Sequence, residues 1–359
     1  MKKIKKILVI IQRSNGDVFL STSLIRKLYS FYESPAIDLL INDDTNSIAS
    51  LIPHIRKIHT FSYMQKKNNR WKQEVNLLFK LFKKYDLSIN LTSSDRSVFY
   101  SLMAGKKSIS AVEIESRKSW WKKIFLTHYY YFDNSNHILT NNLKPLICLN
   151  VDFDNVHYSF NVSENAEKSI ENKLKKLKVK RFIIFHPSAQ YEYKIYPQHL
   201  RNKLLDGLNN LGISIIITGS NNSIDMEVKK NLPSLPNIID FIGDTSIEEF
   251  FVLSKLSLCY IGMDTLNMHI AASQNKRIFA IFGPTNLKMW SPWSNSIESS
   301  ASEDKPLQTY GNVTIFQSGL PCVACAKAGC DNQLGRSECL YVIDPEKIIY
   351  QVKEWYEKL

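Results

Sequence analysis

The sequence lacks any apolar run of the roughly 18 residues that a membrane-spanning helix needs. Its longest apolar runs, such as residues 7–11, have the length of a strand. Glycine and proline are also scarce, at 12 each in 359 residues, which excludes collagen-like and linker-like chains. The basic N-terminus leads into an apolar stretch that stops at Gln12-Arg13, too short for the core of a secretion signal. We therefore expect a soluble, cytoplasmic protein.

Several common catalytic motifs are absent as well. The chain has no Gly-x-Gly-x-x-Gly and no Gly-x4-Gly-Lys-Ser/Thr. It therefore lacks the usual motifs of dinucleotide-dependent oxidoreductases and of P-loop hydrolases. It has no His-Glu-x-x-His and no Gly-x-Ser-x-Gly, the usual signatures of zinc proteases and α/β-hydrolases. Any enzymatic activity must therefore come from other residues.

Negative charge is in short supply. Lys and Arg number 46 against 34 Asp and Glu, a net charge of +12. Such an excess favours an anionic partner, namely nucleic acid, anionic lipid or a phosphorylated substrate. An AT-rich genome, which inflates the use of lysine, is an alternative explanation of comparable weight. Segment 117–132 interleaves basic residues with Trp, Phe and Tyr, which is typical of a lipid headgroup interface. Packing of these rings within their own domain is the alternative for each ring taken singly.

Four of the six cysteines are clustered near the C-terminus, in the spacing Cys322-x2-Cys325-x4-Cys330-x8-Cys339. In a cytosolic protein such a cluster indicates a metal or redox site rather than disulfides. Four thiolates can hold Zn or Fe tetrahedrally. The spacing matches no standard zinc-finger pattern, so a reduced loop without metal is the alternative.

Short buried strands alternate with amphipathic helices in both halves of the chain, which predicts an α/β fold with parallel sheets. In the first half, an amphipathic helix over 69–84 carries Trp71, Val75, Leu78, Phe79 and Phe82 on one face. The predicted strands cover 7–11, 37–41, 87–91, 182–185, 213–218, 238–241, 258–261 and 277–282. We expect two doubly wound, Rossmann-like domains facing a central cleft, with ligands beyond the carboxyl ends of the strands.

Three loops at strand ends hold candidate functional residues. Asp17 follows the first strand, where a carboxylate can act as a general base; capping of the next helix is the commoner role and is favoured by the sequence alone. Lys194 follows the strand at 182–185 and suits a phosphate, although most lysines are solvated surface charges. Asp264 and Thr265 begin the helix at 266–273, where backbone N–H groups favour an anion, and His269 lies one turn inside. A capped helix with a buried histidine is the alternative.

Together these loops resemble glycosyltransferase family 9, the ADP-heptose:lipopolysaccharide heptosyltransferases. The resemblance rests on stretches whose order and spacing match the family and which cover most of the chain. They are ILVIIQRSNGDVFLSTSLIRKL, IIFHPSAQYEYKIYP, IGDTSIEEF, GMDTLNMHIAA and IFGPTNLKMWSPW. The cysteine cluster and the IDPEKI that follows it also resemble family tails. Two positions depart from the family, since Ser188 and Leu266 stand where glycine is common.

The resemblance implies a GT-B fold and an inverting transferase that needs no cofactor for catalysis. An acceptor-binding domain would span 1–160 and a nucleotide-sugar domain 161–343, with a final helix at 344–359 packing back on the first domain. The family's catalytic base falls on Asp17. Its phosphate-binding lysine falls on Lys194, and its other donor-binding positions fall on Thr245, Asp264, Thr265 and His269.

The partners implied are ADP-heptose and an anionic glycolipid acceptor, with peripheral contact at the inner face of the inner membrane through 117–132 and no nucleic acid. A protein O-heptosyltransferase with a cysteine-bound metal is one alternative. A basic, metal-bearing nucleic-acid-binding protein is the other.

Overall fold

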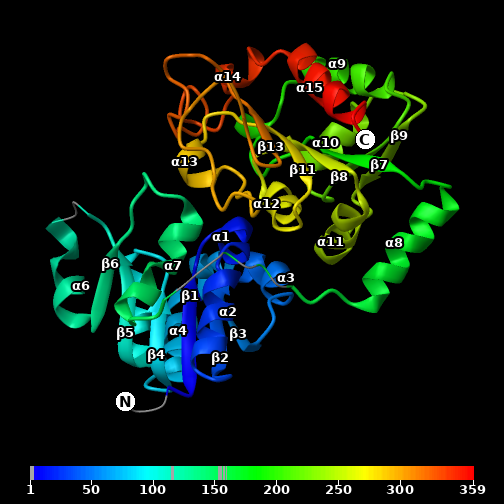
Figure 1. The fold of residues 1–359 in the computed structure, drawn as a ribbon. Helices are drawn as coiled ribbons and strands as arrows, with labels where there is room; N and C mark the ends of the chain where they lie inside the picture. The colour runs from blue at the N-terminus through cyan, green and yellow to red at the C-terminus, as the bar shows by residue number, and fades with distance from the viewer. Residues whose placement is uncertain (1–3, 115–116, 153–155, 157, 159) are drawn as a thin grey trace. The chain divides into compact units, whose positions relative to one another are not determined.

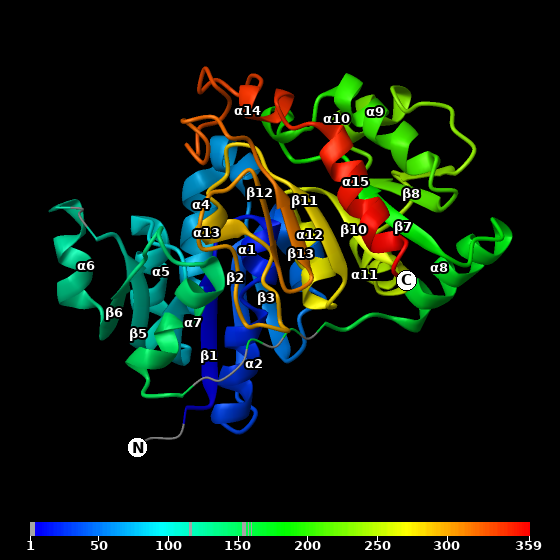
Figure 2. The same cartoon turned by 45° about the horizontal axis from the view of Figure 1, so that its top comes forward.

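The computed structural model describes the chain except for residues 1–3, 115–116, 153–155, 157 and 159, and the side chains of 65–68. Its contacts divide the chain into two compact units, Met1–Asn161 and Val162–Leu359. Each unit is built on a sheet of mainly parallel strands with helices against it (Figures 1 and 2). The predicted α/β class with two Rossmann-like sheets is confirmed. The cleft between them stays a prediction.

The strands of the N-terminal sheet are parallel and follow the order β3-β2-β1-β4-β5-β6. The winding reverses beside β1, which pairs with β2 on one side and with β4 on the other. Ligands of doubly wound sheets bind at such a reversal, beyond the carboxyl ends of the strands. The described strands are β1 (Lys6–Ile11), β2 (Ala36–Asn42), β3 (Ile55–Phe61), β4 (Tyr85–Asn90), β5 (Gly105–Val112) and β6 (His128–Tyr131).

Along the chain, helices of the N-terminal unit connect these strands. Two helices follow β1, and segment 117–132 folds as a short helix followed by the edge strand β6. The described helices are α1 (Asn15–Phe19), α2 (Thr22–Phe31), α3 (Asn46–Ala49), α4 (Tyr63–Leu81), α5 (Asp95–Ala104), α6 (Trp120–Phe125) and α7 (Ile138–Cys148). None of the helices described in either unit combines the length and apolar character needed to cross a membrane.

The face of helix α4 that packs on the sheet is not the apolar face predicted from the sequence. Leu77 and Leu81 are buried against the sheet, in a core that they share with α5. Trp71 and Phe79, predicted on the apolar face, are 82% and 77% exposed. The helix therefore carries two adjacent apolar stripes, and only the leucine stripe is covered. Periodicity alone cannot tell which of the two will meet the sheet.

The C-terminal sheet follows the order β12-β13-β11-β10-β7-β8-β9, and only the β12–β13 pair is antiparallel. Its winding reverses beside β7, which pairs with β8 on one side and with β10 on the other. The described strands are β7 (Phe182–His186), β8 (Ser214–Gly219), β9 (Ile238–Ile242), β10 (Cys259–Met263), β11 (Arg277–Ile281), β12 (Leu307–Tyr310) and β13 (Val313–Phe316).

Helices α8 and α15 illustrate how caps set the helix boundaries of the C-terminal unit. Ser163 caps α8 and Asp344 caps α15, as their sequences predict. Helix α15 packs against α9 of its own unit, and its predicted contact with the N-terminal domain stays a prediction. The described helices are α8 (Glu164–Lys176), α9 (Gln198–Asn209), α10 (Ser223–Lys230), α11 (Ile247–Leu256), α12 (Leu266–Ser273), α13 (Leu287–Trp290), α14 (Glu338–Tyr341) and α15 (Pro345–Tyr356).

Candidate functional site

The loop after β1 places Asp17 at the winding reversal of the N-terminal sheet. Its side chain is buried, and Oδ2 accepts hydrogen bonds from the Ser14 backbone N (3.3 Å) and from Ser14 Oγ (2.6 Å). Oδ1 lies 3.4 Å from Arg13 Nε. Ser14, not Asp17, is the N-cap of α1, so the capping role favoured by the sequence is wrong in position. Asp17 instead closes a capping box from the third helical residue.

Other polar side chains meet at this edge of the sheet. Within the described part of the chain, the following buried atoms have no hydrogen-bond partner: both amide atoms of Gln12 and the Oδ1 atoms of Asn15 and Asn42. Asn42 Nδ2 donates to the carbonyl of Arg13 (3.3 Å), which ties the end of β2 to the loop after β1. Buried polar atoms are normally paired, so this group is suited to hydrogen-bond a ligand. Sequence reasoning missed Gln12 and Asn42, although both are polar residues at the end of a buried strand.

The loops after β7 and β10 bring Lys194 and Asp264 together in the C-terminal unit. Lys194 ends a 3-10 turn (Glu192–Lys194), and its Nζ donates to Oδ2 of Asp264 at 3.2 Å. The charge of Asp264 raises the pKa of Lys194, outweighing the opposite effect of burial. These two predicted residues, 70 positions apart in sequence, thus form one charged pair at the winding reversal.

Thr265 and His269 lie on the helix that starts beside this pair. Thr265 occupies the N-cap position of α12 without a side-chain capping hydrogen bond, and its Oγ1 lies 3.4 Å from the hydroxyl of Tyr260. His269 is buried one turn into α12. The first N–H groups of a helix carry partial positive charge, so a ligand phosphate beside Thr265 would be stabilised.

Thr245 lies farther along the same edge of the sheet. It is half-buried in the turn between β9 and α11, next to Ser246, which caps α11. Strand β8 separates β9 from β7, so Thr245 is less central than Lys194 and Asp264.

His186 is a buried residue that supports the site. Its Nδ1 lies 3.0 Å from Thr218 Oγ1 and 3.1 Å from Asn267 Nδ2. Burial lowers its pKa to about 4, against an opposing effect of Asp225. The imidazole is therefore neutral at pH 7. Gly262 allows β10 to pass beside it, because a Cβ there would lie 2.4 Å from the His186 carbonyl oxygen.

Three cysteines of the cluster lie in the loop before α14 and Cys339 lies in α14, and the four thiols do not form a coordination shell. Cys322, Cys325 and Cys330 are exposed and Cys339 is buried, and all four are free. Burial, together with the charges of the other three thiols, raises the pKa of Cys339 to about 11. Within the described ranges, no three His, Cys, Asp or Glu side chains are grouped so that they could hold a metal ion.

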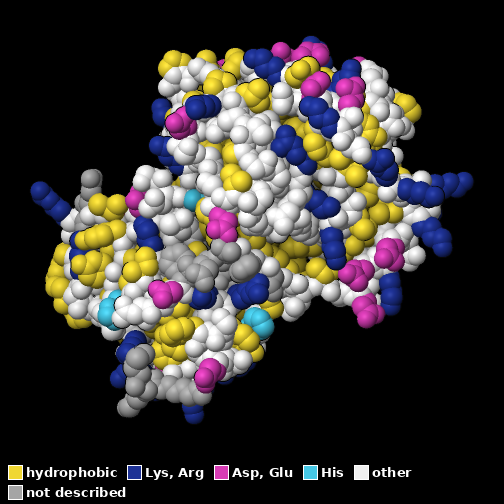
Figure 3. Space-filling model, viewed as in Figure 1, with side chains coloured by type: hydrophobic (Ala, Val, Ile, Leu, Met, Phe, Trp, Pro, Cys, Tyr) yellow, Lys and Arg dark blue, Asp and Glu magenta, His cyan; other side chains and the backbone are white. Residues whose placement is uncertain are grey.

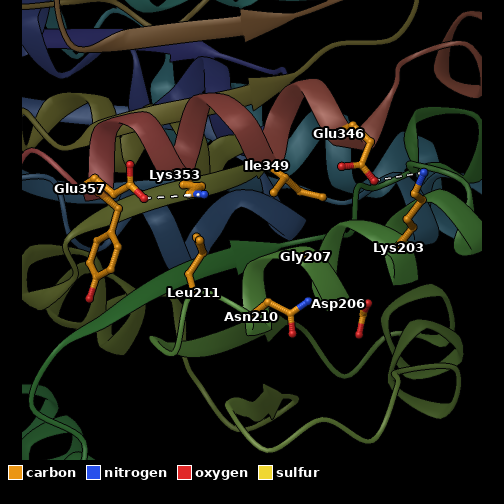
Figure 4. Close-up of a pocket in the computed structure, with 10 residues that line it drawn as sticks. Lys203, Asp206, Gly207, Asn210, Leu211, Glu346, Ile349, Lys353 and Glu357 are labelled. Carbon is orange, nitrogen blue, oxygen red and sulfur yellow. Dashed lines mark ion pairs between the residues drawn. The ribbon is translucent and has the colours of Figure 1, made fainter.

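A groove of about 590 Å³ in the C-terminal unit lies apart from these residues. Figure 4 shows it between α9 and α15, with ion pairs from Lys203 to Glu346 (3.1 Å) and from Lys353 to Glu357 (3.7 Å). None of the residues predicted for catalysis, donor binding or metal binding lines it.

Known proteins share both the sequence pattern and the fold. The lipopolysaccharide heptosyltransferase 3 of Escherichia coli K12 is 27% identical over 293 residues, covering 79% of this chain and 84% of that protein. A family 9 glycosyltransferase from Veillonella parvula matches with a TM-score of 0.76 and 16% identity, covering 99% of this chain and 98% of that one. The E. coli ADP-heptose lipopolysaccharide heptosyltransferase II matches with a TM-score of 0.71 and 19% identity, covering 99% and 100%.

The family model "Glycosyltransferase family 9 (heptosyltransferase)" matches residues 76–318, well over half of the chain. This match confirms the resemblance seen in the sequence and favours neither the protein-modifying nor the nucleic-acid-binding alternative. The chain belongs to glycosyltransferase family 9, the heptosyltransferase family.

Proposed function

We propose that the protein transfers a heptose from ADP-heptose to the core of lipopolysaccharide or a related surface glycan. The observation that carries the proposal is the Lys194–Asp264 pair at the carboxyl ends of β7 and β10, beside the start of α12. This is the position where a doubly wound sheet binds a nucleotide. The heptosyltransferases named above support the identity of sugar and acceptor.

The C-terminal unit would bind the donor. Lys194 supplies a cation for the diphosphate, and the N–H groups at the start of α12 supply hydrogen-bond donors. Thr265 adds a hydroxyl at the same point. His269 supports α12 from its buried side. Thr245, in the turn between β9 and α11, would contact the nucleotide from the β9 end of the sheet. As ADP leaves, negative charge grows on the diphosphate, so the same groups stabilise the transition state.

The N-terminal unit would bind the acceptor and supply the base. Asp17 accepts the proton of the acceptor hydroxyl while that oxygen attacks the anomeric carbon of the heptose. The bond from this carbon to the diphosphate oxygen breaks, its electron pair leaves with ADP, and the configuration inverts. The unpaired amide atoms of Gln12 and Asn42 are suited to hydroxyl groups of the acceptor sugar.

A transfer assay tests the proposal. Purified protein is incubated with ADP-heptose and lipopolysaccharide core acceptors of increasing length, and both ADP release and the glycan product are measured. ADP-heptose should react, and GDP- and UDP-sugars should not. Absence of ADP release with every core acceptor would contradict the proposal.

An anionic glycolipid acceptor places the reaction at a membrane surface. Segment 117–132 keeps Trp120, Ile124 and Phe125 exposed on α6, with Lys118 and Lys123 nearby in sequence. These side chains support the contact with the inner face of the inner membrane that the sequence suggests, and a peripheral, cytoplasmic location.

We also propose that the cysteine loop takes up a structural Zn or Fe ion with no part in the chemical step. Four thiols within residues 322–339, three in a loop and one in α14, are a suitable set of donor types. The backbone N–H of Glu338 already donates to Sγ of Cys330 (3.3 Å), a contact that stabilises a metal-bound thiolate. Elemental analysis should find metal in the wild type and little in Cys325→Ser, with a lower melting temperature for the variant. Metal-free wild type of unchanged stability would contradict this.

A further inference from the structure

Helix α4 exposes a stripe of apolar side chains that its own unit does not cover. Trp71, Val75, Phe79 and Phe82 recur at helical spacing and are all exposed. Met64 is also exposed, but a kink at Asn69 separates it from this stripe. Single exposed apolar residues are ordinary, but a stripe with three aromatic rings indicates a surface that is covered in use.

The stripe belongs to a wider layer formed by α4, α5 and α6 on one face of the N-terminal sheet. Helices α4 and α5 share the core formed by Leu77, Leu81 and Tyr100. Helix α6 joins α5 through Trp121, which packs on the cluster that contains Val98. An ion pair between the buried Lys122 and the exposed Asp95 (2.8 Å) links α6 to the first turn of α5. We call this group of helices the α4–α6 layer.

Each helix of the α4–α6 layer contributes exposed aromatic rings. Phe99 of α5 is exposed, and so are Trp120 and Phe125 of α6. In Figure 3, hydrophobic side chains gather at the left, where Figure 1 places α6. The apolar stripe on α4 therefore has counterparts on both of the other helices.

The charges around these rings are predominantly positive. Exposed lysines accompany the apolar stripe of α4, and exposed basic residues precede α6; they are Lys72, Lys80, Lys83, Lys84, Arg117 and Lys118. Among the described carboxylates of the layer, Glu74 lies 3.6 Å from Arg70, whereas Asp95 and Glu113 share the buried Lys122 at 2.8 and 3.6 Å. The six exposed basic residues outnumber these three carboxylates, so the described surface of the layer is net positive.

We propose that the α4–α6 layer docks on an anionic phospholipid bilayer, with α4 lying in the interface and Trp71 and Phe79 inserted among the headgroups. Aromatic rings flanked by lysine are suited to that environment, where rings bury and ammonium groups meet lipid phosphate. A second copy of the chain fits poorly, because two such faces would bring like charges together. The proposal extends the membrane contact of segment 117–132 to the whole α4–α6 layer. It rests on the proposed function, because that function supplies the glycolipid acceptor at the membrane.

Vesicle sedimentation with the full chain tests the docking. Wild type should bind vesicles of phosphatidylcholine mixed with phosphatidylglycerol and bind pure phosphatidylcholine weakly. The double variant Trp71→Ser/Phe79→Ser should lose at least about tenfold in partitioning, and Lys80→Glu/Lys83→Glu should lose the preference for anionic lipid. Tyr350→Ser, which removes an exposed ring from α15, is the matched control and should bind like wild type.

Equal binding of wild type and the Trp71/Phe79 variant would overturn the proposal, and so would an equal loss in the Tyr350 control. A dimer in light scattering that the same double variant abolishes would assign the face to a second copy instead. Transfer to a deacylated, soluble acceptor separates the two claims. If the Trp71/Phe79 double variant still transfers heptose to this acceptor, the proposed transferase function stands, whatever the vesicle experiment shows. If wild type does not transfer heptose to it, the proposed function is contradicted, but the docking proposal is not.

Discussion

The ammonium Nζ of Lys194 lies 3.2 Å from Oδ2 of Asp264, so the carboxylate that follows β10 holds the cation that follows β7. Asp264 also raises the pKa of Lys194, which keeps the lysine charged at neutral pH. A diphosphate that binds here must share or displace this partner. The two residues should therefore have opposite effects on donor affinity.

Replacement of Lys194 by Ala should weaken ADP binding by about 10- to 100-fold, the value of a charge-assisted hydrogen bond to phosphate. Lys194→Arg should recover part of the loss because the charge is kept. Isothermal titration calorimetry with ADP measures the effect. Lys168→Ala, which removes an exposed lysine of α8 in the same unit, is the control and should bind ADP like wild type. Unchanged ADP affinity in Lys194→Ala would remove this residue from the donor site.

Asp264→Asn should tighten ADP binding by about two- to tenfold, because Lys194 no longer has a competing carboxylate. The gain should shrink as salt is added, since screening weakens the competition between the partly exposed charges. Titrations with ADP at low and high ionic strength measure both effects. Weaker binding at every salt concentration would show that Asp264 contributes contacts to the nucleotide rather than competing with it.

Asp17→Asn should lower kcat by about 10²- to 10⁴-fold, the usual contribution of a general base. ADP affinity should not change, because the residue lies in the other unit from Lys194 and Asp264. Ser14→Ala is the matched control: it breaks the capping box, at a cost of about 1 kcal/mol in stability, but leaves the carboxylate in place. Equal kcat values for the two variants would reduce Asp17 to a structural residue.

The donor loops could be predicted from sequence because each follows a short, apolar strand with a clear end. The spacing places Lys194 and Asp264 beyond β7 and β10, and the parallel pairing of these strands then brings them together. The contact itself could not be derived, because neighbouring strands in the sheet are not neighbours in sequence. The buried face of α4 could not be predicted for a related reason. Trp71 and Leu77 are both apolar, so periodicity does not distinguish them; only the packing of Leu77 with β1, β2 and α5 does.

His186 should make stability depend on pH in a defined window. Its folded pKa of about 4 lies below the ordinary histidine value of 6.5, so the unfolded state binds more protons between these values. Stability should be fully present above pH 6.5 and fall as the pH drops toward 4, with a total loss of up to about 3 kcal/mol. Denaturant unfolding of wild type and His186→Gln at several pH values measures this. A slope that is equally steep in the variant would assign the pH dependence to other groups.

Gly262→Ala should destabilise the C-terminal unit by about 3 kcal/mol, because extra volume in a packed core forces the backbone to move. The added Cβ would lie 2.4 Å from the carbonyl oxygen of His186 and 2.9 Å from the hydroxyl of Tyr260. Movement of β10 away from β7 would also separate Asp264 from Lys194, so ADP binding should weaken together with stability. Gly319→Ala is the control for thermal unfolding, since the nearest atom to its added Cβ is Pro306 Cγ at 3.4 Å. Equal melting temperatures for Gly262→Ala and Gly319→Ala would mean that β10 can shift at no cost in stability. The close approach of β7 and β10 would then have no role in aligning Lys194 with Asp264.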